Sequence, residues 1–326
     1  MEKQKHGSWV ELPPTKYPYK TRMGGATVTV FVPYNCQNHC PFCINKEEYE
    51  CMEGFSAEKI CESIKKMNAL TPYCDFVFTG GEPFANLESL QTMLDEIPTT
   101  HKVYINTTLP VSKTVSEEDI IAFTEKNKDK ITCINVSRHM QHYVQESNDG
   151  LLAKLAVPFR INCVLYKQYP KDGIVPYLER FRKIPGATIQ FRFDYTATTP
   201  ENLYDREEDN IYHDLTKIAK YVGLDGCRMR CGFHFDYKGM RLTYHKTLPY
   251  SEIVEKDEST NKTYAILYDI LIKQTGAIHG DWDGTLLDLD AYSKVVYEPY
   301  DLHWLEGKNQ STFETLRVFK NACAVL

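Results

Sequence analysis

Strand-like and helix-like segments alternate along the first 200 residues of this 326-residue chain. Apolar, β-branched and aromatic residues predict six strands, each followed by a segment with helical spacing of its apolar residues. The predicted strands are 26–32, 76–79, 103–107, 132–137, 159–166 and 188–194. The predicted helices are 56–70, 86–97, 116–128, 149–156, 174–184 and 210–222.

This alternation favours consecutive βα units, which form parallel sheets with right-handed crossovers. Two architectures remain open on this evidence, a partial (β/α)6 barrel and a doubly wound open sheet. In both, the loops that follow the carboxyl ends of the strands collect the functional residues.

The loop that follows the first predicted strand contains three cysteines at the spacing C-x3-C-x2-C. They are Cys36, Cys40 and Cys43, in the stretch VFVPYNCQNHCPFCIN. Three thiolates from one short loop can bind one [4Fe-4S] cluster. Because such a cluster has four irons, one iron is left without a protein ligand, and an open coordination position is typical of a reactive metal site.

A glycine-rich turn follows the second predicted strand. Gly80, Gly81 and Glu82 come directly after the apolar run 76–78 and precede Pro83. Two consecutive glycines allow a ligand to approach the backbone closely. The turn is therefore a second candidate binding segment.

The cysteine triplet and the GGEP turn together resemble the radical S-adenosylmethionine (radical SAM) superfamily. The resemblance implies that Cys36, Cys40 and Cys43 bind a [4Fe-4S] cluster and that S-adenosylmethionine (SAM) binds the free iron. It implies that Gly80, Gly81 and Glu82 hold the methionine end of SAM. It covers about the first 200 residues and favours the partial, TIM-like (β/α)6 barrel over the open sheet.

Further cofactor contacts follow from the same resemblance. Phe42 fits the aromatic position before the third cysteine. Ser137, at the end of the fourth strand, and Arg160, in the fifth, match cofactor contacts in the molybdenum-cofactor and peptide-modifying branch of the superfamily. Thr107, which ends the third strand with Asn106, is expected to line the adenosyl pocket. Each of these polar residues has an alternative interpretation as an ordinary structural group of the barrel interior.

Residues past 200 depart from the βα pattern. Segments 233–237 and 240–244 flank Lys238-Gly239 and predict a β-hairpin, 264–273 predicts a helix, and Ser311 with Glu314 predicts a capping box. We expect an N-terminal extension (1–23), a barrel core (24–200), and a last barrel helix with a small α+β capping segment (201–326).

Two other groups of residues are candidates for a functional role. The segment 137–143 is rich in hydrogen-bonding side chains; Arg138 suits a carboxylate or phosphate, and His139 suits proton transfer. Cys227, Cys231 and His234 repeat part of the cluster spacing, but they lack a convincing fourth ligand. We interpret the first as a candidate substrate loop or a solvated loop, and the second as ordinary thiols rather than a second metal site.

Composition sets the remaining expectations. Hydrophobic residues make up 42% and charged residues 25% of the chain, no apolar run reaches 18 residues, and residues 1–20 lack the apolar stretch of a secretory signal. We therefore expect a cytoplasmic protein without a membrane partner, whose 11 cysteines are reduced. A net charge of −6 makes nucleic acid an improbable partner.

The resemblance implies an enzyme that takes one electron from a low-potential donor of the flavodoxin or ferredoxin type. It then cleaves SAM reductively to a 5′-deoxyadenosyl radical, which abstracts hydrogen from a substrate. We rank a small-molecule or nucleotide-like substrate first, with a weak likeness to viperin-like enzymes, and a peptide second. The alternative from another class is a non-catalytic iron–sulfur or zinc redox module.

Overall fold

The computed structural model describes most of the chain between residues 17 and 298. The described residues are 17–21, 25–32, 36–43, 45, 54–70, 73–141, 144, 146–166, 170–193, 210–224, 232–245, 254–267, 269–279 and 296–298.

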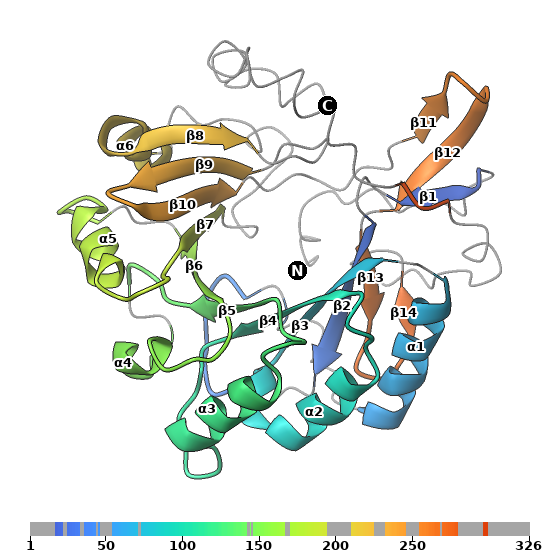
Figure 1. Cartoon of the computed structure of the whole chain (residues 1–326), viewed down its shortest axis with the longest axis horizontal. Coiled ribbons are helices and arrows are strands. Elements are labelled where there is room, and N and C mark those ends of the chain that lie inside the picture. Colours follow the sequence, from blue (N-terminus) through green and yellow to red (C-terminus); the bar gives the residue numbers. More distant parts are fainter. Residues whose placement is uncertain are drawn as a thin grey trace, which may run out of the picture.

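Six parallel strands in sequence order form the centre of the fold (Figure 1). Each pairs with the next along the chain, which is the arrangement that repeated βα units produce. The strands are β2 (Ala26–Val32), β3 (Cys74–Gly80), β4 (Lys102–Thr107), β5 (Cys133–Ser137), β6 (Phe159–Leu165) and β7 (Ile189–Phe193). All six strands predicted from the sequence are confirmed.

Helices lie along the outer side of this curved sheet (Figure 1). They are α1 (Ala57–Leu70), α2 (Leu87–Asp95), α3 (Glu117–Lys126), α4 (Asp149–Leu152) and α5 (Val175–Arg182), with the 3-10 turn η2 (Pro83–Ala85) before α2. The predicted caps are present. Asn86 accepts from the Ser89 amide at 2.9 Å, and Ser116 forms a capping box with Asp119. Helix α4 ends four residues earlier than the predicted 156.

The sheet extends beyond the six strands on both sides. On one side β10 (Met240–His245) pairs in parallel with β7, followed by β9 (Gly232–Tyr237) and β8 (Lys220–Leu224). On the other side β13 (Asp269–Ile272) pairs in parallel with β2 and leads to β14 (Ile278–His279). Within the described residues the order runs from β14 to β8 without closing. The predicted partial barrel is confirmed, and it forms part of a longer open sheet.

Of the helix predictions past residue 200, one is confirmed with an earlier end and one is wrong. The predicted helix 210–222 is helix α6 (Asn210–Ile218) followed by β8, and the predicted helix 264–273 is β12 (Lys262–Leu267) followed by β13. Short apolar runs satisfy helical and strand spacing equally. Strand β8 pairs with β9, and β13 pairs with β2. These pairings favour the strand conformation because they satisfy the backbone polar groups.

The predicted hairpin is confirmed as β9 and β10, whose turn has Lys238 and Gly239 at positive φ. A second, three-stranded sheet contains β1 (Tyr19–Thr21), β12 and β11 (Val254–Asp257). The predicted cap at Ser311 and Glu314 lies outside the described residues, and the predicted division into 1–23, 24–200 and 201–326 stays a prediction. None of the described helices is long and apolar enough to cross a membrane.

Candidate functional site

The cysteine loop and the Gly-Gly-Glu turn leave the sheet side by side. Strands β2 and β3 are parallel neighbours, and Val32 at the end of β2 is in register with Gly80 at the end of β3. Adjacent strands in a sheet lie about 4.8 Å apart. Two motifs separated by more than 30 residues in sequence therefore begin at neighbouring points of one sheet edge.

The three cysteines are half-buried, and none forms a disulfide. The Cys43 amide donates to the Cys40 carbonyl at 3.2 Å, which closes a turn around the last two. Burial raises the pKa of the Cys36 thiol, and the nearby charges of Glu82 and Cys43 raise it further, while the Asn38 amide lowers it. A cation placed here would reverse this balance and favour the thiolate that iron requires.

Among the described residues, no three His, Cys, Asp or Glu side chains converge closely enough to hold a single metal ion. A [4Fe-4S] cluster does not require such convergence, because each cysteine binds a different iron. The three thiols in one loop beside a buried carboxylate fit a cluster better than they fit a mononuclear zinc, whose ligands surround one point.

Phe42 attaches the cysteine loop to the ends of two more strands. Its ring packs edge-on against His139, with centroids 4.7 Å apart, and tilted against Tyr166, at 5.5 Å. These residues follow β5 and β6. Phe42 therefore orients the loop across the sheet edge.

His139 accepts a hydrogen bond at Nδ1 from the Val164 amide at 3.1 Å. Burial, with a smaller effect of the Arg138 charge, lowers the pKa of His139 to about 4. The side chain is thus neutral near pH 7. The sequence-based suggestion that His139 transfers protons at neutral pH is not supported.

Glu82 is buried at the turn after β3 and is held by four donors. The Phe84 amide donates to Oε1 at 3.1 Å, the Thr107 hydroxyl donates to the same oxygen, and the Thr108 amide and hydroxyl donate to Oε2 at 2.8 and 2.7 Å. Burial raises the pKa of Glu82, and these hydrogen bonds oppose that rise. The end of β4 therefore fixes the carboxylate that ends the Gly-Gly-Glu turn, and Thr107, predicted as a cofactor contact, bonds to Glu82.

Asn45 connects the cysteine loop to the glycine turn. Gly80 has φ +116°, a conformation that favours glycine, and its carbonyl accepts from Asn45 Nδ2 at 3.1 Å. The Asn45 Oδ1 atom is buried and accepts no hydrogen bond from the described part of the chain. An unpaired acceptor beside Gly80 suits a donor such as the amino group of SAM. The sequence analysis missed this residue, whose signal was its position two residues after Cys43.

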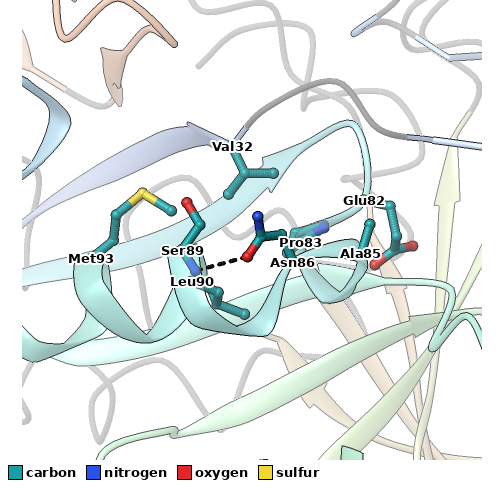
Figure 2. Close-up of a pocket in the computed structure, with 8 residues that line it drawn as sticks. All are labelled: Val32, Glu82, Pro83, Ala85, Asn86, Ser89, Leu90 and Met93. Carbon is teal, nitrogen blue, oxygen red and sulfur yellow. Dashed lines mark hydrogen bonds between the residues drawn. The ribbon is translucent and has the colours of Figure 1, made fainter. Parts of the chain in front are cut away.

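A pocket of about 50 Å³ lies beneath the same turn (Figure 2). Glu82, Pro83, Ala85, Asn86 and Ser89 line it together with the apolar side chains of Val32, Leu90 and Met93. Its volume holds about one or two water molecules, so it cannot contain SAM. The pocket is a packing gap between the turn and α2 rather than the cofactor site.

Arg160 belongs to a hydrogen-bonded chain across three strands. Its Nε and Nη2 atoms donate to Asn135 Oδ1 at 3.1 and 2.8 Å, and Asn135 Nδ2 donates to Asn106 Oδ1 at 2.7 Å. The three residues are in register on β6, β5 and β4. Arg160 is therefore oriented by neighbouring strands.

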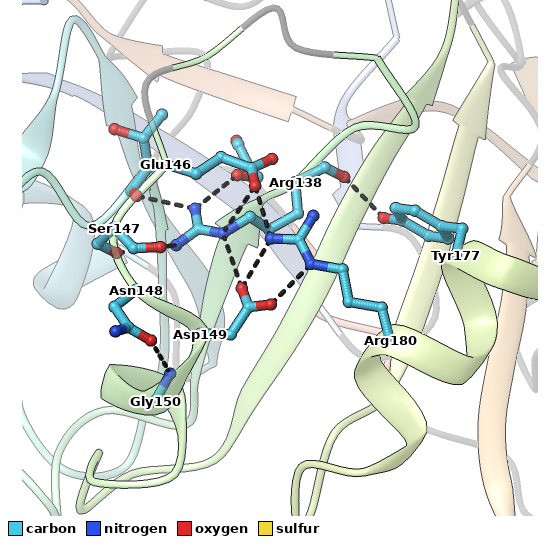
Figure 3. A network of polar contacts seen from close by, with 10 residues as sticks. Arg138, Glu146, Ser147, Asn148, Asp149, Gly150, Tyr177 and Arg180 are labelled. Atoms are coloured by element: carbon cyan, nitrogen blue, oxygen red, sulfur yellow. Dashed lines mark hydrogen bonds and ion pairs between the residues drawn. The ribbon is translucent and has the colours of Figure 1, made fainter.

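Ser137 lies half-buried at the end of β5, and its carbonyl accepts from Arg138 Nη1 at 2.9 Å. The Arg138 side chain is fully buried (Figure 3). It also donates to the Thr108 carbonyl at 3.0 Å and the Ser147 hydroxyl at 2.8 Å, and its Nε lies 4.0 and 3.9 Å from the Glu146 and Asp149 carboxylates.

Arg180 of α5 binds the same two carboxylates, to Glu146 at 2.7 Å and to Asp149 at 2.6 and 2.8 Å. Figure 3 shows the two guanidinium groups on either side of this acidic pair. The Arg138 side chain is thus buried and bonded to other groups of the protein. Its suggested role in binding a substrate carboxylate or phosphate is not supported.

His234 lies on β9, where its Nδ1 is 3.0 Å from the Thr243 hydroxyl. Cys227 and Cys231 lie outside the described residues. The interpretation that these three residues form no second metal site stays a prediction.

Comparison with known proteins agrees with this geometry. Residues 23–149 match the family model of the 4Fe-4S single cluster domain. The fold resembles crystal structures of Streptococcus suis SuiB. The first has a TM-score of 0.52 and 14% identity over 90% of this chain and 68% of SuiB. The structure of SuiB bound to precursor peptide SuiA has a TM-score of 0.51 and 14% identity, over 89% of this chain and 66% of SuiB. The structure of SuiB bound to SAM has a TM-score of 0.50 and 15% identity, over 89% of this chain and 65% of SuiB.

The chain spans about two thirds of the length of SuiB. No curated protein matches it by sequence. The matched cluster domain and the fold both agree with the resemblance to the radical SAM superfamily that was drawn from the sequence. The cysteine triplet and the Gly-Gly-Glu turn both lie within residues 23–149, which match the 4Fe-4S single cluster domain.

Proposed function

We propose that this chain is a radical SAM enzyme whose cluster is held by Cys36, Cys40 and Cys43. The observation that carries the proposal is the register of Val32 with Gly80, which starts the cysteine loop and the Gly-Gly-Glu turn at adjacent points. The effect of Glu82 on the pKa of Cys36 supports the same proximity. When bound, the cluster and SAM supply an electron and a 5′-deoxyadenosyl radical for hydrogen abstraction.

The roles of the chain's own residues follow from their contacts. Glu82 provides a fixed negative charge for the SAM ammonium group, and Gly80 and Gly81 let the backbone approach it. Asn45 offers its unpaired Oδ1 to the same ammonium group. Thr107 acts on the cofactor through Glu82, whose carboxylate it helps to orient.

Further contacts lie on the neighbouring strand ends. Phe42 holds the cysteine loop against the ends of β5 and β6. Ser137 and Arg160, on those strands, are proposed to contact the adenosyl part of SAM. The Asn135 side chain keeps Arg160 in place for this contact.

We propose a peptide as the substrate class. SuiB, which shares the fold, has been crystallised with its precursor peptide SuiA. This likeness reverses the sequence-based ranking, in which a small-molecule or nucleotide-like substrate came first. A low-potential flavodoxin or ferredoxin type of protein is the proposed electron donor.

The test is anaerobic reconstitution of the full chain with iron and sulfide, followed by dithionite and SAM. Release of 5′-deoxyadenosine and methionine is the expected result. A cluster that is ligated by four cysteines and leaves SAM intact would establish the alternative, a non-catalytic redox module. Zinc in place of iron after metal analysis would also overturn the proposal.

A further inference from the structure

A row of polar side chains crosses five strands of the sheet. Its members are directly in register, each with the next. Neighbouring strands are about 4.8 Å apart, so the row is continuous. We name it the polar row; it consists of Ser137 (β5), Asn162 (β6), Gln190 (β7), Thr243 (β10) and His234 (β9).

The polar row lies on the face of the sheet that points away from the helices. Tyr177 of α5 packs against Phe191, with ring centroids 6.1 Å apart. Tyr212 of α6 packs against Phe233 and Tyr244, at 5.5 and 5.3 Å. Successive residues in a strand point to opposite faces. The polar neighbours of these aromatic residues therefore point to the concave side.

Two acceptors in this row are buried without a donor. Gln190 is 2% exposed and Asn162 is 9% exposed, yet Gln190 Oε1 and Asn162 Oδ1 accept no hydrogen bond from any described residue. A buried, unsatisfied polar group destabilises the folded state, and native structures contain few of them. Two unpaired acceptors in adjacent register positions on one face of the sheet indicate a site where another molecule donates hydrogen bonds to them.

A donor without an acceptor lies next to them. Arg192 follows Gln190 by two residues on β7 and so shares its face. Its Nε atom is buried and donates no hydrogen bond to the described part of the chain. The same patch thus presents two unpaired acceptors and one unpaired donor.

We propose that Asn162, Gln190 and Arg192 bind an amide group of a peptide substrate, whose N–H donates to the two amide oxygens and whose C=O accepts from Arg192. The chemistry selects this ligand. An ammonium group requires a carboxylate for charge neutralisation, and the polar row contains none. A nucleobase, which can stack on an imidazole or a guanidinium plane, is the competing ligand and is therefore included in the test.

This inference rests on the proposed function, because it places the substrate relative to SAM. Ser137, the proposed adenosyl contact, is adjacent to Asn162 in the row. Asn162 and Gln190 are thus about 5 and 10 Å from Ser137 along the sheet. An amide bound there would lie near the adenosyl group, as hydrogen abstraction requires.

The test uses NMR of the full-length, ¹⁵N-labelled protein and follows the side-chain amide signals of Asn162 and Gln190, assigned by their loss in Asn162→Leu and Gln190→Leu. N-acetylglycinamide is the amide probe, and cytidine is the nucleobase probe. N,N-dimethylacetamide, which lacks an N–H, is the control. We expect N-acetylglycinamide to shift both signals and the control to leave them unchanged, and each leucine variant to weaken binding about tenfold.

Shifts caused by cytidine but not by N-acetylglycinamide would overturn the peptide-amide assignment. Shifts by none of the probes would show that the two acceptors are merely hydrated and would overturn the site. Radical chemistry is not involved in this measurement. Loss of 5′-deoxyadenosine release with intact probe binding would therefore refute the proposed function and leave the amide site standing.

Thermal unfolding provides an independent check. Gln190→Leu removes an unsatisfied acceptor and should leave the midpoint unchanged or raise it. The matched control is Gln91→Leu, because the Gln91 amide is paired with Asn127 and Asp95 at 2.7–3.2 Å. Gln91→Leu should lower the midpoint. An equal loss in Gln190→Leu would show that its amide is paired within the protein and would overturn the inference.

Discussion

The Thr108 hydroxyl donates to Glu82 Oε2 at 2.7 Å, and the Thr108 amide donates to the same oxygen at 2.8 Å. Thr108, at the end of β4, thus provides both hydrogen bonds to one oxygen of the Glu82 carboxylate, which ends the Gly-Gly-Glu turn after β3. Its hydroxyl also accepts from Asn38 Nδ2 in the cysteine loop, at 3.4 Å. Thr108, absent from the residues selected by sequence, connects the two proposed cofactor-binding segments.

Thr108→Val tests this connection. Valine has the same shape but cannot donate, so the pKa of Glu82 should rise further and its charge should hold the SAM ammonium group less well. Hydrogen bonds to a charged group contribute about 1.5–3 kcal/mol, and we expect at least about a tenfold weaker SAM affinity. Equilibrium binding of SAM to the cluster-loaded protein measures it.

Thr92→Val is the matched control, because the Thr92 hydroxyl is exposed and donates to the Glu88 carbonyl within its own helix. It should bind SAM normally. Equal affinities of both variants and the unmodified protein would contradict the role of Thr108. Iron content should be unchanged in both.

Replacement of any one of Cys36, Cys40 and Cys43 by alanine should remove the brown iron–sulfur absorbance and all SAM cleavage, because each is proposed to bind a different iron. Cys61→Ala is the control. Cys61 lies on α1, and its thiol is 3.8 Å from the Thr92 carbonyl. Retention of the absorbance and of 5′-deoxyadenosine release in a triplet variant would refute the cluster assignment.

Arg138→Met should destabilise the protein strongly. The side chain is fully buried, and its removal leaves the Glu146 and Asp149 carboxylates with Arg180 alone. Breaking a buried ion pair costs about 3–5 kcal/mol, and we expect the lower end because Arg180 remains. Urea unfolding measures the loss.

The control is Arg182→Met, since Arg182 pairs with Glu179 at the surface, at 2.7 Å. Solvent screens such a pair, so no measurable change is expected. If Arg138→Met were as stable as this control, the buried network in Figure 3 would not contribute to stability.

Folding stability should decrease as the pH falls from about 6.5 to about 4. The pKa of His139 is lowered from 6.5 to about 4 in the folded chain, so between these values the unfolded chain binds a proton that the folded chain does not. Its contribution is complete above pH 6.5 and lost progressively below it. The shift corresponds to on the order of 3 kcal/mol.

His139→Gln keeps an acceptor for the Val164 amide but does not titrate. Unfolding free energies at pH 7 and pH 4.5 should therefore differ less in this variant than in the unmodified protein. An equal decrease in both would show that other groups cause the pH dependence.

The sequence was sufficient for the elements whose signals are local. The apolar strands from Ala26–Val32 onwards and the caps at Asn86 and Ser116 were predicted correctly, because cap and period depend on residues within one or two turns. The cysteine spacing and the Gly-Gly-Glu turn indicated the resemblance to the radical SAM superfamily in the same way.

Long-range pairing decided what the sequence left open. Segment 264–273 has apolar spacing that suits a helix, yet β13 completes the sheet beside β2. Arg138 and His139 were suggested as substrate groups, and burial among Glu146, Asp149, Phe42 and the β6 backbone gives them structural surroundings instead.

Sequence alone therefore determined which motifs this protein carries, since spacing and caps are encoded within a few residues. The tertiary structure decided which side chains meet: Thr108 with Glu82, Asn45 with Gly80, and Asn162 beside Gln190. The physical reason is that register between strands brings together residues far apart in the chain, and burial then sets their charge and the hydrogen bonds open to them.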